Sequence, residues 1–162
     1  MSAHGFEFQG ITGETIRLAD YAGRPVLVVN TASECGYTPQ YADLESLWSQ
    51  YRDKGLVVLG VPSNDFGEQE PGDEAAIQAF CNSNFGIDFP MTAKQTVIGG
   101  AAHPFYRWVV EELGEIAAPK WNFHKYLVGP DGELAGLWPS DVGPLDAEIT
   151  GAIDGLLEDG AA

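Results

Sequence analysis

Cys35 is the residue of this 162-residue sequence whose surroundings best suit covalent chemistry. It stands in the stretch Asn30-Thr-Ala-Ser-Glu-Cys-Gly-Tyr-Thr38, between a run of apolar residues and what we expect to be the first turn of a helix. A loop of Ser, Glu, Gly and Thr is not an apolar core, which argues against a buried, inert thiol. Because a helix N-terminus favours negative charge and the thiolate is the reactive form of cysteine, this position predicts a nucleophile.

Two other uses of a cysteine, acyl transfer and metal binding, find little support in the sequence. Acyl transfer needs an activating base, usually His, and no signature links His4, His103 or His124 to Cys35. The second cysteine, Cys81, lies 46 positions away (81 − 35), which excludes a CxxC motif and does not match the spacing of zinc ligands. We therefore expect no metal site.

The charge balance excludes several classes of partner. Eight Lys and Arg stand against 24 Asp and Glu, and the net charge of −16 repels nucleic acid and anionic membrane surfaces alike. The first residues lack the basic and apolar segments of a secretion signal, and no apolar run approaches the length of a membrane span. We expect a cytoplasmic protein that forms one domain over residues 1–162 and needs no disulfide for stability.

The elements around this cysteine follow from apolar patterning. Pro25–Asn30 and Leu56–Val61 are continuous apolar runs of strand length, typical of parallel strands buried on both faces. Between them apolar residues recur at helical spacing, with Thr38 as the expected N-cap, Pro39 as the first helical residue and Gly55 at the end. This order predicts a β-α-β unit with the cysteine between its first strand and its helix, where open α/β sheets tend to bind ligands.

The rest of the chain predicts three more helices and a hairpin. The helices are expected over about 73–81, from His103-Pro104 to Leu113, and over about 145–157. Apolar segments 123–128 and 134–138 flank Gly129-Pro-Asp-Gly132, a strong turn signal, and so predict an antiparallel hairpin. Parallel strands followed by such a hairpin, with helices between, describe an α/β chain with a thioredoxin-like fold, in which helices flank a central mixed sheet.

Three segments give the sequence a resemblance to the glutathione peroxidase family. They are Asn30 to Thr38, Val61-Pro-Ser-Asn-Asp-Phe-Gly-Glu-Gln-Glu-Pro71 and Lys120-Trp-Asn-Phe123, with Phe89-Pro-Met91 and His103-Pro104 matching between them. The segments occur in the family's order and on its fold, and the resemblance spans nearly the whole chain. It implies an enzyme, a thiol peroxidase that reduces hydroperoxides in the response to oxidative stress and needs no bound cofactor.

The resemblance implies roles for four residues. Cys35 takes the position of the peroxidatic cysteine, which some relatives fill with selenocysteine, and the residues that match its surroundings are Gln69, Trp121 and Asn122. When a thiolate attacks a peroxide oxygen, negative charge moves from sulfur to oxygen. Neutral amide and indole donors can hydrogen-bond both atoms without fixing either in an ion pair. Each of these three residues alone would be interpreted as structural, and only their joint occurrence points to a site.

Two positions depart from the family pattern, and a third suggests the electron donor. Ser63 stands where many relatives have cysteine, and Asp65 where they usually have Gln. Cys81 aligns with the resolving cysteine of the thioredoxin-dependent branch, although its place on one stripe with Ile77 is also that of a core residue. The implied cycle runs from a Cys35 sulfenic acid to a Cys35–Cys81 disulfide that thioredoxin reduces.

Alternatives within and outside the enzyme class stay open. Glutathione could reduce the sulfenic acid directly, with Cys81 a bystander. The chain could also be a redox relay or sensor that passes its oxidation to a client protein. A peroxiredoxin is disfavoured, because the usual Pro-x-x-x-Thr-x-x-Cys arrangement is absent around Cys35.

Partners are also implied by the resemblance. The connection 114–121 is short, as in monomeric relatives, whereas tetrameric, glutathione-using members carry an insertion there. We therefore expect a monomer. Lys94, Lys120 and Lys125 could form a local basic patch that docks an acidic thioredoxin.

The position of Cys81 predicts a moving segment. We expect Cys81 to face inward near the end of its helix, too far from Cys35 for a disulfide, which requires a Cα separation of about 4.4 to 6.8 Å. The segment from about Asp73 to Asn84 should therefore unwind, at least at its C-terminal end, when the disulfide forms. Asn82-Ser-Asn84 favours this, because it is a weak helix former.

Overall fold

A central four-stranded sheet organises the chain. The computed structural model describes residues 2–161, with side chains for residues 2–158. The strand order is β4-β3-β5-β6: β3 (Val26–Thr31) pairs in parallel with β4 (Val57–Pro62) and antiparallel with β5 (Lys125–Val128), which forms a hairpin with β6 (Leu134–Trp138). The parallel pair and the hairpin predicted from the sequence are therefore confirmed, with shifts only at their ends.

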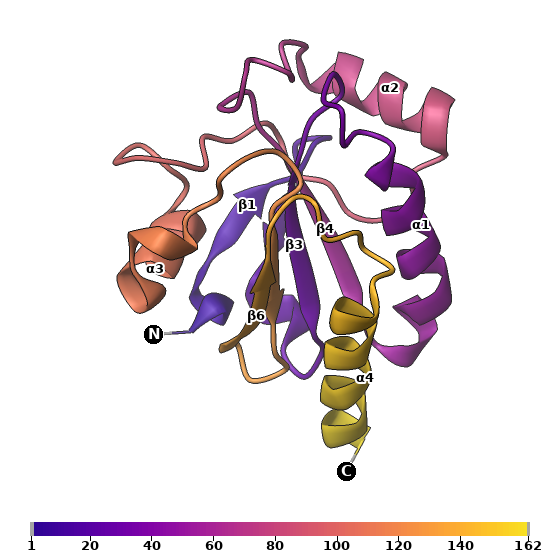
Figure 1. Ribbon diagram of the computed structural model, residues 1–162, viewed down its shortest axis with the longest axis vertical. Coiled ribbons are helices and arrows are strands. Elements are labelled where there is room, and N and C mark those ends of the chain that lie inside the picture. Colours follow the sequence, from indigo (N-terminus) through magenta and orange to yellow (C-terminus); the bar gives the residue numbers. More distant parts are fainter. Residues whose placement is uncertain (1, 162) are drawn as a thin grey trace.

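Helices cover both faces of this sheet. Figure 1 shows α1 (Gln40–Tyr51) and α4 (Ala147–Ala161) on one side and α3 (Pro104–Leu113) on the other. Alternate side chains of β3 divide accordingly, so that Val28 packs in the apolar cluster with α3 and Val29 in the cluster with α1 and α4. A strand that is buried on both faces reads as a continuous apolar run, which explains why the sequence revealed it.

The helix α2 (Glu74–Phe85) lies across the end of the sheet at which β3 and β4 finish (Figure 1). Asp73 caps its N-terminus, and Gly86, with φ of 59°, ends it. The helix runs four residues (85 − 81) past its predicted end at Cys81. The weak helix formers of segment 82–84 lie exposed in the last turns of the helix, where the side-chain amide of Asn84 donates to the carbonyl of Phe80 at 2.9 Å.

A small N-terminal hairpin escaped prediction. It consists of β1 (Glu7–Gln9) and β2 (Thr15–Arg17), each only three residues long, too short for an alternating pattern to stand out. Residues 2–161 also contain four short 3-10 helices, at Ala3–Gly5, Leu18–Tyr21, Arg52–Lys54 and Glu115–Ala117.

The remaining helix ends mostly agree with prediction. His103 caps α3 through its ring nitrogen, and Gly55, with φ of 116°, ends the 3-10 turn that follows α1. Leu113, the last residue of α3, is 46% exposed. No helix in the described part of the chain has the length and apolar character to cross a membrane.

Candidate active site

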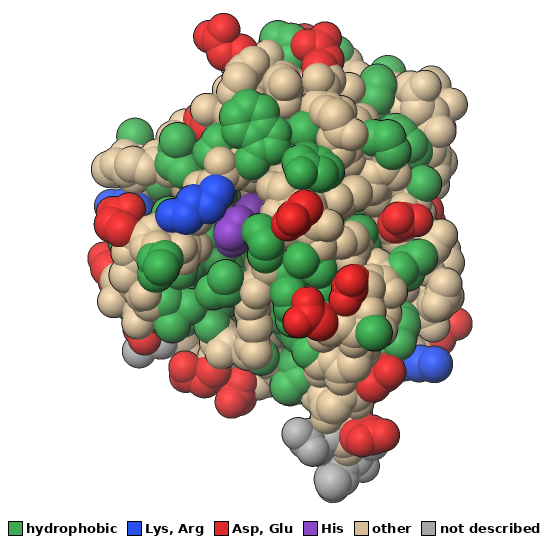
Figure 2. All heavy atoms as spheres, in the orientation of Figure 1, with side chains coloured by type: hydrophobic (Ala, Val, Ile, Leu, Met, Phe, Trp, Pro, Cys, Tyr) green, Lys and Arg blue, Asp and Glu red, His purple; other side chains and the backbone are tan. Residues whose placement is uncertain are grey.

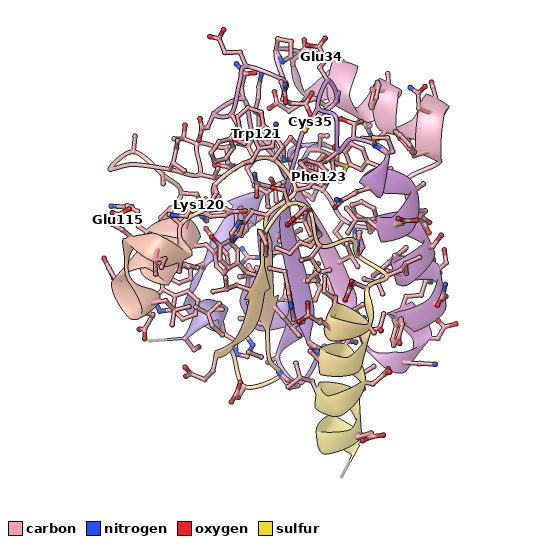
Figure 3. The ribbon with its side chains drawn as sticks, viewed as in Figure 1. Glu34, Cys35, Glu115, Lys120, Trp121 and Phe123 are labelled. Atoms are coloured by element: carbon pink, nitrogen blue, oxygen red, sulfur yellow. The ribbon has the colours of Figure 1, made fainter. Side chains whose placement is uncertain are left out.

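Cys35 lies in the turn that joins β3 to α1, at one end of the sheet (Figure 3). Its Sγ accepts a hydrogen bond from the backbone N–H of Tyr37, at 3.3 Å. Its own N–H donates to the hydroxyl of Thr38 at 2.9 Å, and that hydroxyl donates to the carbonyl of Ala32, also at 2.9 Å. Because the residue is 8% exposed, the turn holds the sulfur just below the surface with one backbone donor aimed at it.

The predicted cap of α1 is wrong. The helix begins at Gln40, after Pro39 in a helical conformation, and Thr38 makes no capping hydrogen bond to it. The hydroxyl of Thr38 is already engaged by Cys35 and Ala32, so it closes the cysteine turn instead. The donor that faces the sulfur therefore belongs to this turn and not to the first turn of the helix.

Gln69 and Asn122 are in direct contact although 53 positions separate them. The side-chain amide of Asn122 donates to Oε1 of Gln69 at 2.9 Å and to the carbonyl of Phe66 at 3.4 Å. This arrangement occupies the oxygen of the Gln69 amide and leaves its NH₂ group available to donate. The N–H of Glu34, next to Cys35, donates to the Gln69 carbonyl at 3.0 Å and so ties the two segments together.

Trp121 stands at the same end of the sheet as Cys35 and Glu34, as Figure 3 shows. Its half-buried ring packs on Phe66, with ring centroids 5.8 Å apart. Gly67 runs close to this ring with φ of 65°, and a Cβ placed there would lie 2.9 Å from Cη2 of Trp121. Both the backbone conformation and the close contact therefore require glycine.

Asn30 is a positioning residue that the sequence did not single out. Its side-chain amide donates to the carbonyl of Trp121 at 3.0 Å, and its own carbonyl accepts from the N–H of Phe123 at 2.6 Å. Phe123 has φ of 65°, a conformation rare for an aromatic residue, so these bonds hold a strained turn that presents Trp121 and Asn122. A lone Asn at the end of an apolar strand was the available signal.

The arrangement suits chemistry in which negative charge moves between atoms. The donor on the sulfur, the Tyr37 N–H, is neutral, and so are the donor groups that the neighbouring segments carry, the Gln69 amide and the Trp121 indole. Neutral donors can stabilise a thiolate and then an oxygen anion without an ion pair that would hold the charge at either atom.

Cys81 lies on α2 and is buried, with 2% of its surface exposed. Burial raises the pKa of its thiol to about 11, and the neighbouring Tyr41 only partly offsets this. The two cysteines belong to the same apolar cluster, and both thiols are free. The inward orientation of Cys81 expected from the sequence is therefore confirmed.

The predicted basic patch is wrong for Lys125. That residue is fully buried, and its Nζ donates to the carbonyls of Phe123 at 2.7 Å and Ser140 at 3.4 Å. Burial lowers the pKa of Lys125 to about 8. The ammonium groups of Lys94 and Lys120 each donate to a backbone carbonyl, and Lys120 is the exposed member of the three. On the face that Figure 2 displays, Lys and Arg side chains are few and lie among acidic ones.

In the described part of the chain, no histidine is hydrogen-bonded to Cys35. His124 follows the Trp121 turn, but it is buried and neither ring nitrogen has a hydrogen-bond partner among the described residues. Burial, assisted by Lys125 and Lys120, lowers the pKa of His124 to about 4, so its ring is neutral at pH 7. The described residues also contain no group of three or more His, Cys, Asp and Glu able to hold a metal ion.

Ser63 and Asp65, the two departures from the family pattern, are linked to each other by a hydrogen bond. The hydroxyl of buried Ser63 accepts from the N–H of Asp65 at 3.3 Å. The carboxylate of Asp65 accepts in turn from the N–H of Val97 at 2.6 Å. These bonds tie the segment that carries Gln69 to the chain that leads to α3.

Comparisons with known proteins agree with this geometry. The family model for glutathione peroxidase matches residues 3–110. The glutathione peroxidase-like peroxiredoxin GPX5 of Chlamydomonas reinhardtii is 42% identical over 143 residues, which are 87% of this chain and 88% of that protein. The hydroperoxy fatty acid reductase gpx1 of Synechocystis sp. is 38% identical over 162 aligned positions, covering 95% of each chain.

The fold has a wider set of neighbours. A thiol:disulfide interchange protein of the thioredoxin family from Chlorobium tepidum superposes with a TM-score of 0.64 over 94% of this chain and 92% of that one, at 16% identity. At that identity the likeness concerns the fold alone, and it confirms the predicted thioredoxin-like architecture. With the match to the family model and two relatives of about 40% identity, the chain belongs to the glutathione peroxidase family and is a peroxidase.

Proposed function

We propose that this peroxidase reduces hydrogen peroxide and organic hydroperoxides with Cys35 as its nucleophile. The thiolate attacks the terminal peroxide oxygen, the O–O bond breaks, and hydroxide or alkoxide leaves and takes up a proton. Sulfur is thereby oxidised to a sulfenic acid. The NH₂ group of Gln69 and the indole of Trp121 donate to sulfur and oxygen as the charge passes between them, while Asn122 orients Gln69.

One observation supports this proposal above the others. The hydrogen bond from Asn122 to Gln69 fixes the side-chain amide by its oxygen, and the Glu34 N–H holds the same residue beside the cysteine turn. A surface Gln would need neither bond. The name of the Synechocystis relative, a hydroperoxy fatty acid reductase, supports organic hydroperoxides as substrates.

In the second step, Cys81 condenses with the sulfenic acid to a Cys35–Cys81 disulfide. Because burial raises the pKa of Cys81 to about 11, its thiol is almost entirely protonated at pH 7 while α2 stays folded. Opening of the segment 73–84 would both bring the sulfur atoms together and release the thiol from its buried site. This is why we expect α2 to unwind, at least at its C-terminal end.

Thioredoxin is the proposed reductant of that disulfide. The relative from Chlamydomonas carries the name peroxiredoxin, which supports recycling through a disulfide. A monomeric state, a single domain over 1–162 and a cytoplasmic location stay predictions. The two apolar clusters on opposite faces of one sheet support the single domain.

Peroxide-dependent consumption of NADPH tests this function. The assay is run once with thioredoxin and its reductase and once with glutathione and its reductase, for the wild type and for Cys35→Ser. We expect turnover with thioredoxin that Cys35→Ser abolishes. Equal or faster turnover with glutathione alone would replace the proposed donor. Slow turnover with both, together with rapid formation of a mixed disulfide with a client, would identify a redox relay instead.

A further inference from the structure

Glu70 is a carboxylic acid buried beside the proposed reaction site. The residue is 1% exposed, and its Oε2 has no hydrogen-bond partner among the described residues. Its backbone is fixed on both sides: the N–H donates to Oδ1 of Asn64 at 2.9 Å, and the carbonyl accepts from Nζ of Lys94 at 3.0 Å. A buried carboxyl group with an unpartnered oxygen is costly to the fold, so its presence calls for a function.

The carboxyl group of Glu70 lies between the two segments that carry the cysteines. It shares a cavity with Ser33 of the Cys35 turn and with Ile77, which precedes Cys81 by one turn on the buried face of α2. Tyr41 and Cys81 lie within reach of its charge. The hydroxyls of Ser33 and Tyr41 make no hydrogen bond of normal geometry among the described residues, yet they lie close enough to lower the pKa of Glu70 and of Cys81 respectively. A surface cavity of about 270 Å³ opens at this junction, and its lining includes Ser33, Glu34, Glu70, Ile77 and Phe80.

The charges around Glu70 keep both of its forms accessible. Burial raises the pKa of its carboxyl group to about 7, and Glu34 raises it further, while Ser33 and Lys94 oppose the increase. At neutral pH the group can therefore both accept and donate a proton. The pKa of Cys81 is raised mainly by burial, and the negative charge of Glu70 raises it further.

We propose that Glu70 accepts the proton of the Cys81 thiol and returns it to the oxygen that leaves Cys35. This inference rests on the proposed disulfide cycle. The electron pair of the Cys81 sulfur forms the S–S bond, and the S–O bond of the Cys35 sulfenic acid breaks. The hydroxide that leaves takes the proton from Glu70 and becomes water. Cys81 is oxidised, Cys35 is reduced from the sulfenic level, and Glu70 ends as a carboxylate ready for another cycle.

The rate of disulfide formation as a function of pH tests this role. Wild-type protein and Glu70→Gln are oxidised with one equivalent of hydrogen peroxide and quenched at intervals. Mass spectrometry then separates the disulfide from sulfenic acid trapped by dimedone. We expect the wild-type rate to rise through a step near pH 7, as Glu70 ionises. Glu70→Gln should lose that step and be slower at pH 7.5 by at least about tenfold, since a general base typically contributes about 10² to 10⁴ in rate.

The opposite result is expected if Glu70 acts only through its field. Removing its charge would then lower the pKa of Cys81, and Glu70→Gln would form the disulfide faster than the wild type. Glu70→Asp, which keeps a carboxyl group, should retain the pH step. Glu68→Gln, which changes an exposed carboxylate two positions away, should leave both the rate and the step unchanged.

Two further outcomes separate this inference from the proposed cycle. If wild-type protein forms no Cys35–Cys81 disulfide, the cycle itself is wrong. If the wild type forms the disulfide with no step near pH 7, or if Glu70→Gln matches it in rate and profile, only the role of Glu70 is overturned.

Discussion

The hydrogen bond from Asn122 to Gln69 yields the sharpest prediction about peroxide oxidation. In Asn122→Ala, the Gln69 amide and the Phe66 carbonyl both lose a buried partner, at a cost of about 1–3 kcal/mol in the free energy of unfolding. For a chain of this length that lowers the melting temperature by about 2–4 °C per kcal/mol. Because the Gln69 amide then rotates freely, its donor is lost for part of the time. We expect oxidation of Cys35 to slow by about tenfold to a hundredfold.

Asn122→Asp tests the orientation of the Gln69 amide without removing the volume of the side chain at position 122. Aspartate keeps the volume but cannot donate, so the Gln69 amide must turn its NH₂ group toward residue 122 and its oxygen toward the site. Oxidation should then be slower than in Asn122→Ala, although the side chain still fills its buried place. The control is Asn82→Ala, which truncates an exposed Asn on α2.

Stopped-flow oxidation in a Cys81→Ser background isolates the first step for these variants. Chemical unfolding of each variant gives its stability in parallel. If Asn122→Asp is oxidised as fast as the wild type, Gln69 does not act as an oriented donor and the reasoning is refuted. A rate loss that merely follows the loss of stability across the variants would refute it equally.

Three further predictions concern packing, motion and pH. Gly67→Ala should lower the free energy of unfolding by about 1–2 kcal/mol, because alanine is strained in the left-handed backbone conformation of Gly67. The added methyl group should also contact the Trp121 ring and shift its fluorescence. Unchanged unfolding and emission would count against that packing. Amide exchange over residues 77–86 should become faster on oxidation of the wild type but not of Cys81→Ser, and unchanged exchange in disulfide-bonded protein would mean that the thiols were already close. The pKa of His124 is lowered to about 4 in the folded state, so the unfolded chain binds its proton first as pH falls. Protonation of His124 in the unfolded chain should lower the free energy of unfolding progressively from about pH 6.5 to pH 4. His124→Phe should flatten this pH dependence in urea unfolding. An unchanged dependence on pH would contradict the lowered pKa of His124.

Apolar pattern and turn chemistry sufficed to predict most of the fold. β3 and β4 are runs of Val and Leu because the sheet is covered on both faces, and Gly129-Pro-Asp-Gly132 marks the hairpin between β5 and β6. The hairpin of β1 and β2 escaped because three-residue strands carry almost no periodicity.

The side-chain geometry of the site was less accessible from the sequence. Threonine is a residue type that favours the N-cap position, yet the Thr38 hydroxyl closes the turn around Cys35. This depends on the position of the Ala32 carbonyl in space, which the sequence does not reveal. Lys125 looked like a surface residue, but two backbone carbonyls satisfy its ammonium in the interior. Glu70 lies in the segment Val61–Pro71 that carries the family resemblance, but the sequence predicted no role for it. Residue spacing does not show whether a single carboxyl group is buried.

The most direct test of the account is the fate of the Cys35 sulfur after one equivalent of hydroperoxide. Mass spectrometry of peptides from the wild type should show a Cys35–Cys81 disulfide, and Cys81→Ser should instead carry a dimedone-trapped sulfenic acid on Cys35. Cys35→Ser should remain unmodified at Cys81 over the same time. Oxidation that appears first at Cys81, or peroxide consumption by Cys35→Ser at the wild-type rate, would contradict the assignment of Cys35 as the residue that attacks the peroxide.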